Sequence, residues 1–231
     1  MNYLIYVSLG VLPSFIWLLF FLKKDSHPES NRMVIKIFLY GMLAAIPAAL
    51  IELGFVNLFP FSKNAIFAQI LYFFIGIALI EELLKYLVVR DKALSDSELD
   101  EPTDVMLYMI ISALGFAALE NIIYLSPLKI GEVFLIAAFR FIGATFLHAL
   151  CSAVLGYFLA LSFLKTGEKL KLFAFGLLIA VVLHGLFNFS IIMLGGNLKL
   201  IVPIIILIVL ALAVSLGFKN LKEMASVCKP K

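Results

Sequence analysis

The chain has 231 residues, of which 64% are hydrophobic and only 14% are charged, and its mean hydropathy is +1.12. This composition excludes a soluble globular domain and indicates a polytopic membrane protein. The formal net charge is +3, and its lysines and arginines gather in a few loops, so the charge indicates membrane orientation and not a nucleic-acid partner. The two cysteines, Cys151 and Cys228, form neither a CxxC pair nor a disulfide framework.

The first apolar run, residues 2–22, is predicted to be a retained first span and not a cleavable signal peptide. No basic residue precedes this run, whereas Lys23 and Lys24 follow it directly. Pro13 lies inside the run, so we expect a kink in this helix.

Six further apolar runs are long enough to cross a hydrocarbon core about 30 Å thick. Their expected ranges are 33–59, 64–90, 105–125, 132–164, 170–194 and 200–218. The run 132–164 is too long for one straight crossing, so we expect it to tilt, project or break near Gly143 or Gly156. No strand alternation or internal repeat is visible. The sequence therefore predicts an all-α bundle of about seven transmembrane helices in a single transmembrane domain, 1–231.

Basic residues are distributed unevenly between the two sides of the predicted bundle. One side carries Lys23, Lys24, Arg32, Lys36, Arg90, Lys92, Lys165, Lys169, Lys171, Lys219, Lys222, Lys229 and Lys231. The other side carries only Lys63, Lys129 and Lys199. The positive-inside rule therefore predicts an N-terminus outside the cell and a C-terminus in the cytoplasm.

Three ionisable residues, Glu81, Glu82 and Lys85, lie inside the third apolar run. A charge at membrane depth costs about 3 kcal/mol on insertion scales. On a helix Glu81 lies four residues from Lys85 and Glu82 lies three, so both carboxylates reach the ammonium. An internally neutralised pair that only fixes helix packing remains an alternative, but a second adjacent carboxylate favours a functional role.

Polar residues also interrupt the fourth, fifth and sixth apolar runs. They are Glu120 and Asn121 in the fourth, Arg140 and His148 in the fifth, and His184 and Asn188 in the sixth. Such residues face a bundle interior or a wet cavity and not lipid. We therefore expect a polar core on the spans within 64–194, with spans 2–22 and 200–218 at the periphery.

Structural roles remain open for several of these residues. Glu120 could form a salt bridge with Arg140, with or without a catalytic role. Glu52, in the second run, is expected to be structural or to lie at the rim of a cavity. Asn188 could bridge helices, although its spacing of four residues from His184 favours a shared site.

Depth along the helices provides a further test of which residues can meet. At about 1.5 Å per residue, Glu81, His148 and His184 each lie well inside their spans and could meet near the middle. Glu120 fits less well, because it lies near the outer end of its span unless that helix is set lower in the bilayer. One glutamate and two histidines could hold a zinc ion with an open position, but the chain has no HExxH motif and no GxSxG motif.

The same residues could hydrolyse an amide without a metal. Glu81 or Glu82 could take a proton from a water molecule as its oxygen attacks the amide carbon. His184 and Asn188 could stabilise the oxyanion. His148 could orient the water or protonate the leaving amine.

Four motifs on four successive spans carry a resemblance to a known family. They are Glu-Glu-x-x-Lys at 81–85, Gly-Phe-x-x-x-Glu-Asn at 115–121, Arg-x7-His at 140–148 and His-Gly-x-x-Asn at 184–188. In this order they resemble the PrsW family of intramembrane proteases, which is related to the CAAX prenyl endopeptidases and to bacteriocin-processing membrane enzymes. The resemblance covers residues 81–188, nearly half of the chain.

The resemblance implies a prokaryotic multi-pass cell-membrane peptidase whose substrate is a single-span membrane protein, typically an anti-sigma factor. The implied catalytic residues are Glu81, Glu82, His148 and His184, with Asn188 stabilising the oxyanion. We expect Lys85, Glu120, Asn121 and Arg140 to support them.

Two other classes of protein remain as alternatives. Buried glutamate, histidine and arginine residues also build proton relays, so a proton- or cation-coupled transporter is the first, although no repeated halves are visible. A non-catalytic scaffold that binds membrane helices is the second. No cofactor is certain, although zinc is a candidate. The oligomeric state is open, because the span 200–218 could face lipid or a second copy.

Overall fold

The computed structural model describes residues 2–24, 27–62, 65–96, 98–164 and 166–227, and this part of the chain contains helices and no strand. The elements are α1 (Asn2–Leu22), α2 (Asn31–Leu58), α3 (Ile66–Ile70), the π-helix η1 (Leu71–Leu79), α4 (Ile80–Lys92), α5 (Pro102–Leu125), α6 (Ile130–Ile142), α7 (Ala144–Leu164), the 3-10 turn η2 (Thr166–Glu168), α8 (Lys169–Met193) and α9 (Leu198–Val227). The predicted all-α fold is confirmed.

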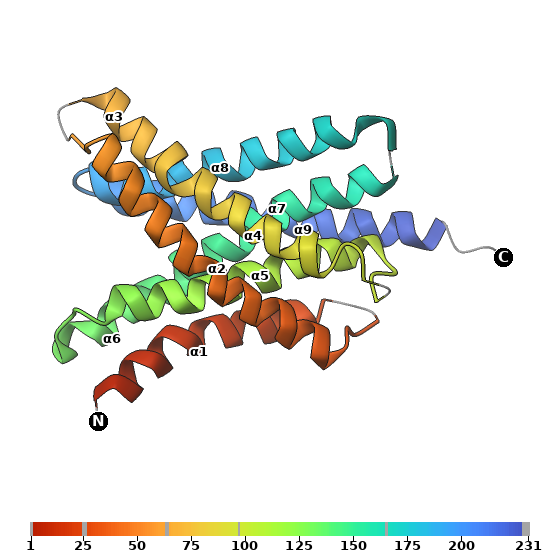
Figure 1. Cartoon of the computed structure of the whole chain (residues 1–231), viewed down its shortest axis with the longest axis horizontal. Helices are drawn as coiled ribbons and strands as arrows, with labels where there is room; N and C mark the ends of the chain where they lie inside the picture. Colours follow the sequence, from red (N-terminus) through yellow and green to blue (C-terminus); the bar gives the residue numbers. More distant parts are fainter. Residues whose placement is uncertain (1, 25–26, 63–64, 97, 165, 228–231) are drawn as a thin grey trace.

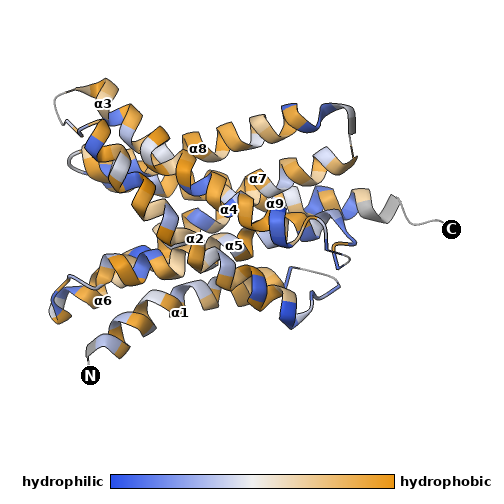
Figure 2. Ribbon diagram, in the orientation of Figure 1, coloured by the Kyte–Doolittle hydropathy of each residue, from blue (hydrophilic) through white to orange (hydrophobic). Residues whose placement is uncertain are grey.

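Seven helical stretches of the described residues are long and apolar enough to cross a membrane, and they coincide with the seven predicted spans. Hydrophobic residues cover most of their length, while hydrophilic residues gather in the loops near the C-terminal end of the bundle (Figure 2). These features identify a multi-pass membrane protein. Its orientation stays a prediction, and four of the basic residues on which it rests, Lys63, Lys165, Lys229 and Lys231, lie outside the described residues.

Helix α5 lies in the middle of the bundle (Figure 1) and packs against α1, α2, α4, α6, α7 and α9. Within its span window 78% of the residues are buried, compared with 28–39% in the other spans. The helix begins at Pro102, earlier than expected, because the Asp104 carboxylate accepts hydrogen bonds from the backbone N–H groups of Asp100 and Glu101. The polar residues of the neighbouring helices therefore meet beside α5.

Two glycines let α2 approach α5 backbone to backbone. A Cβ atom on Gly41 would lie 2.2 Å from the carbonyl oxygen of Ser112, and one on Gly115 would lie 2.0 Å from the carbonyl oxygen of Phe38. Small residues at such crossings are typical of packing between membrane helices. Beyond this crossing, the C-terminal part of α2 lies beside η1, where Phe55 contacts Gly76.

The third span, predicted at 64–90, has the π-helix η1, Leu71–Leu79, in its middle. A π-helical stretch changes the rotation of the residues that follow, and such stretches are frequent at functional sites. Helix α4 begins directly after it, and Glu81, Glu82 and Lys85 on α4 are all buried. No feature of the apolar sequence before Ile80 indicates this change of winding.

The fifth span breaks at Gly143, as one of the two expected positions predicted. Helix α6 ends at Ile142 and α7 begins at Ala144, while Gly156 lies inside α7 against the backbone of Met106. The break lets α6 diverge from the α8 side of the bundle (Figure 1).

Candidate functional site

Helix α4 supplies two carboxylates and an ammonium to the centre of the bundle. The Nζ of Lys85 donates hydrogen bonds to Glu81 Oε2 at 3.1 Å and to Glu82 Oε1 at 2.8 Å, as the spacing of these residues predicts. The same ammonium lies 4.6 Å from the centre of the Phe116 ring, a cation–π contact with α5. Ser112 of α5 donates a hydrogen bond to the backbone carbonyl of Lys85 at 3.0 Å. Helix α5 therefore holds both the side chain and the backbone of Lys85.

Glu82 is fully enclosed, and its two oxygens have different partners. Oε2 accepts a hydrogen bond from Ser152 Oγ of α7 at 2.7 Å. Oε1 lies 3.0 Å from Nδ1 of His184 on α8, in addition to its contact with Lys85. Glu82 thus joins α4, α7 and α8 and fixes the orientation of the His184 ring. Ser152 was missed by the sequence analysis, because one serine in an apolar helix looks like any other.

The two imidazoles are arranged in the same way. In each ring, one nitrogen lies beside a carboxylate: His148 Nε2 is 2.7 Å from Glu120 Oε2, and His184 Nδ1 is 3.0 Å from Glu82 Oε1. An ionised carboxylate can only accept a hydrogen bond. The carboxylate-facing nitrogen of each ring therefore carries the proton. Lys85 donates to His148 Nδ1 at 2.8 Å, which confirms a lone pair on that atom. In the neutral rings, His148 Nδ1 and His184 Nε2 are lone-pair donors.

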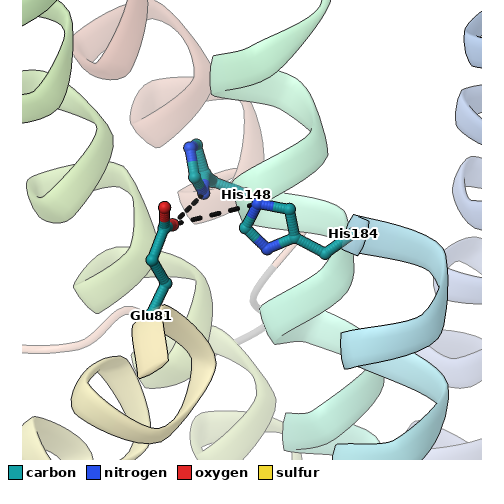
Figure 3. Close-up of side chains that lie close together, drawn as sticks. All are labelled: Glu81, His148 and His184. Carbon is teal, nitrogen blue, oxygen red and sulfur yellow. Dashed lines mark ion pairs between the residues drawn. The ribbon is translucent and has the colours of Figure 1, made fainter. Parts of the chain in front are cut away.

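These two nitrogens lie close to one carboxylate oxygen (Figure 3). Glu81 Oε2 lies 3.5 Å from His148 Nδ1 and 3.9 Å from His184 Nε2. One ligand atom from each of the three residues lies within 4.8 Å of the others, and all three side chains are buried. The expectation that Glu81, His148 and His184 meet deep in the bundle is confirmed.

The donor set fits a zinc ion. Carboxylate oxygen and imidazole nitrogen are common zinc ligands with bonds of about 2.0–2.1 Å, so the edge of a tetrahedral site is about 3.3 Å. The distances from Glu81 Oε2 to the two nitrogens are near this value. In addition, each imidazole has a carboxylate on its other nitrogen, the outer arrangement typical of histidine ligands. However, Lys85 contacts two of the three donor atoms, so an ammonium and a divalent cation would compete for them.

A second polar network extends from His148 toward α6. Glu120 Oε1 lies 3.1 Å from Arg140 Nη2, so the predicted ion pair between these residues is confirmed. The contact does not have the geometry of a hydrogen bond. Arg140 Nε donates to Asn121 Oδ1 at 2.5 Å, and Asn121 Nδ2 donates to Thr145 Oγ1 at 2.9 Å. Glu120 is 31% exposed. The depth estimate fitted Glu120 less well than the histidines unless its helix was set lower in the bilayer, and its contact with His148 places it in the cluster.

Asn188 and Glu52 lie beside the cluster without joining its hydrogen bonds. Asn188 is half-buried one turn after His184 on α8, and within the described part of the chain its side chain has no hydrogen-bond partner. Glu52 is also half-buried, in the C-terminal part of α2. Its expected role, structural or at the rim of a cavity, stays a prediction.

Replacing Ser152 with alanine tests whether α7 holds Glu82 in place. The buried Oε2 of Glu82 would lose its donor, which costs about 1–3 kcal/mol, so the thermal unfolding temperature in detergent should fall. Ser162→Ala on the same helix is the matched control, because the Ser162 hydroxyl donates only to the carbonyl of Leu159 one turn earlier. Equal unfolding temperatures for the two variants would contradict this role of Ser152.

Comparison with known proteins gives the family. The model of the PrsW family of intramembrane metalloproteases matches residues 29–219. Among curated proteins, Protease PrsW of Geobacillus kaustophilus is 33% identical over 152 residues, 65% of this chain and 64% of the relative. Protease PrsW of Oceanobacillus iheyensis is 31% identical over 151 residues, and Protease PrsW of Bacillus subtilis is 26% identical over 152 residues. Each of these two matches covers 65% of this chain and 66% of the relative.

The matches thus span slightly less than two thirds of the length of these bacterial relatives. No solved structure matches the chain. The family match covers the helices from α2 to most of α9 and includes every residue of the buried cluster. The chain belongs to the PrsW family of intramembrane proteases.

Proposed function

We propose that this protein is an intramembrane peptidase that hydrolyses a peptide bond of a membrane-protein substrate at Glu81, His148 and His184. The observation that carries the proposal is the meeting of one carboxylate oxygen and two imidazole lone pairs at a single buried point. The family description and the name Protease PrsW of the curated relatives support the same activity. An anti-sigma factor is the substrate suggested by the motif resemblance.

Glu81, His148 and His184 are the residues that would hold a zinc ion. Such an ion supplies Lewis-acid polarisation of a water molecule and of the scissile carbonyl group. The donor chemistry and the carboxylates behind both imidazoles favour this version of the proposal.

Glu81 receives the proton of the attacking water. Its contacts with Lys85, His148 and His184 all use Oε2, so Oε1 is left to face the water molecule. A carboxylate that takes this proton as the oxygen attacks the amide carbon acts as a general base. Glu82, whose oxygens are both engaged, acts as a positioning residue for His184.

Two further groups complete the reaction. The Asn188 amide, which has no side-chain partner among the described residues and lies one turn from His184, donates a hydrogen bond to the oxyanion. Glu81 returns the proton of the water to the leaving amine. The His148–Glu120 pair, which leads from the buried point to the partly exposed carboxylate, keeps the His148 ring in place during the reaction. Arg140 holds Glu120 at the far side of this pair.

A metal-free version is favoured by the position of Lys85. Its ammonium already supplies a positive charge to Glu81 Oε2 and His148 Nδ1. In this version Glu81 is the base for the water, and Lys85 holds Glu81 and His148 in their relative positions.

Replacing Glu81 with glutamine should abolish proteolysis with the fold retained. An amide cannot take the water proton, so cleavage of a single-span substrate in liposomes should slow by about 100-fold or more. Glu132→Gln is the matched control, because Glu132 is an exposed acid in the first turn of α6. The proposal is wrong if Glu81→Gln cleaves as fast as Glu132→Gln.

Metal analysis of purified protein separates the two versions. If zinc is a ligand of the site, the parent should retain about one zinc per chain, His184→Ala should lose it, and a chelator should stop cleavage. Lys85→Met should then bind zinc more tightly, because it removes the competing ammonium, whereas Lys171→Met at the exposed start of α8 should not. Full activity of zinc-free protein in the presence of chelator would instead establish the metal-free version.

A further inference from the structure

A groove of about 530 Å³ lies between α1, α7 and α9, apart from the buried polar cluster. Phe20 and Phe21 of α1, Phe146 and Leu150 of α7, and Val214 and Phe218 of α9 give it apolar walls. Its volume falls in the range of about 300–1,000 Å³ that is common for ligand sites. None of the residues that form the proposed peptidase site lines it.

One end of this groove is basic. Lys24 at the end of α1 and Lys219 and Lys222 near the end of α9 line it, against a single carboxylate from Glu223. Lys222 donates a hydrogen bond to the backbone carbonyl of Lys24, so the ends of the two helices are held together there. These lysines are exposed and lie near the ends of two candidate membrane spans, where basic side chains commonly meet lipid headgroups.

We propose that this groove binds a phospholipid with an anionic headgroup. An acyl chain would lie along the phenylalanine and leucine walls, and the phosphate would lie among Lys24, Lys219 and Lys222. Basic pockets between membrane helices are suited to anionic headgroups, and the predicted orientation puts these lysines on the cytoplasmic side, where anionic lipids attract basic residues. Lys219 is paired with Glu223 at 3.9 Å, so Lys24 and Lys222 carry the excess positive charge at this end. A soluble anion would leave the apolar walls uncovered, and an apolar helix would bring no negative charge to this excess.

A bound lipid would touch the part of the fold that supports the α6–α7 break. Phe146 lines the groove and stacks on Trp17 with ring centres 4.0 Å apart. Trp17 Nε1 donates a hydrogen bond to the carbonyl of Phe141 at 3.0 Å, just before Gly143. Lipid binding should therefore raise the thermal unfolding temperature. This effect does not depend on the proposed proteolysis.

The test is lipid retention by the full chain in detergent, measured by native mass spectrometry. The probes are phosphatidylglycerol and phosphatidylcholine with identical acyl chains. The parent should retain phosphatidylglycerol preferentially, and the triple variant Lys24→Gln, Lys219→Gln, Lys222→Gln should lose this preference by about tenfold or more. The control variant Lys23→Gln, Lys169→Gln, Lys171→Gln removes three exposed lysines from the same end of the bundle and should keep the preference.

Two further arms distinguish the occupant. Ala211→Trp should fill the apolar part of the groove and abolish retention without changing the charge. Inorganic phosphate should leave the unfolding temperature unchanged, whereas phosphatidylglycerol should raise it. Equal retention of the two lipids by the parent, an equal loss in the control variant, or the same stabilisation by inorganic phosphate would each overturn the proposal.

Discussion

The ammonium of Lys85 is the group on which the buried cluster depends. Two adjacent carboxylates in an apolar segment would repel each other, but Lys85 donates to both and to an imidazole as well. Removing one partner of such a buried pair costs about 3–5 kcal/mol, because the other charge is left without compensation. The Phe116 ring and the Ser112 hydroxyl fix this ammonium from α5. Helix α5, the most buried of the described spans, therefore holds the buried ammonium of Lys85 in place.

Around Lys85, the residues that hold the histidines differ from the residue that faces the proposed water molecule. Glu82 and Glu120 each accept a hydrogen bond from the protonated ring nitrogen of one histidine. The other nitrogen of each ring, which carries a lone pair, is therefore directed toward the same point. Glu81 is the carboxylate that faces this point. A site whose reacting groups are held by a second layer of hydrogen bonds is pre-organised for its reaction. The glutamate pair thus divides its work, with Glu82 holding a histidine and Glu81 facing the proposed water.

The sequence predicted the seven spans because the thickness of a membrane sets a minimum length for apolar runs. For the same reason it predicted that the fifth run would tilt, project or break near Gly143 or Gly156, and the structure shows a break at Gly143. It also identified the charged members of the cluster, because ionisable groups are rare in such runs. The π-helix and the partners Ser152 and Thr145 were missed, since apolar winding and short hydroxyl side chains leave no distinct pattern. Counting residues fitted Glu120 less well than the histidines unless its helix was set lower in the bilayer, because such counting does not fix the position of one helix relative to another; the structure brings Glu120 into contact with His148.

The central claim is that Glu81 and His184 act on the same water molecule or metal ion. A double-mutant cycle of substrate cleavage with Glu81→Gln, His184→Ala and the double variant tests it directly. Residues that act as a unit are strongly non-additive, so the double variant should cleave about as slowly as the slower single variant. Losses that multiply in the double variant would contradict the account, because they would show that the two residues act independently.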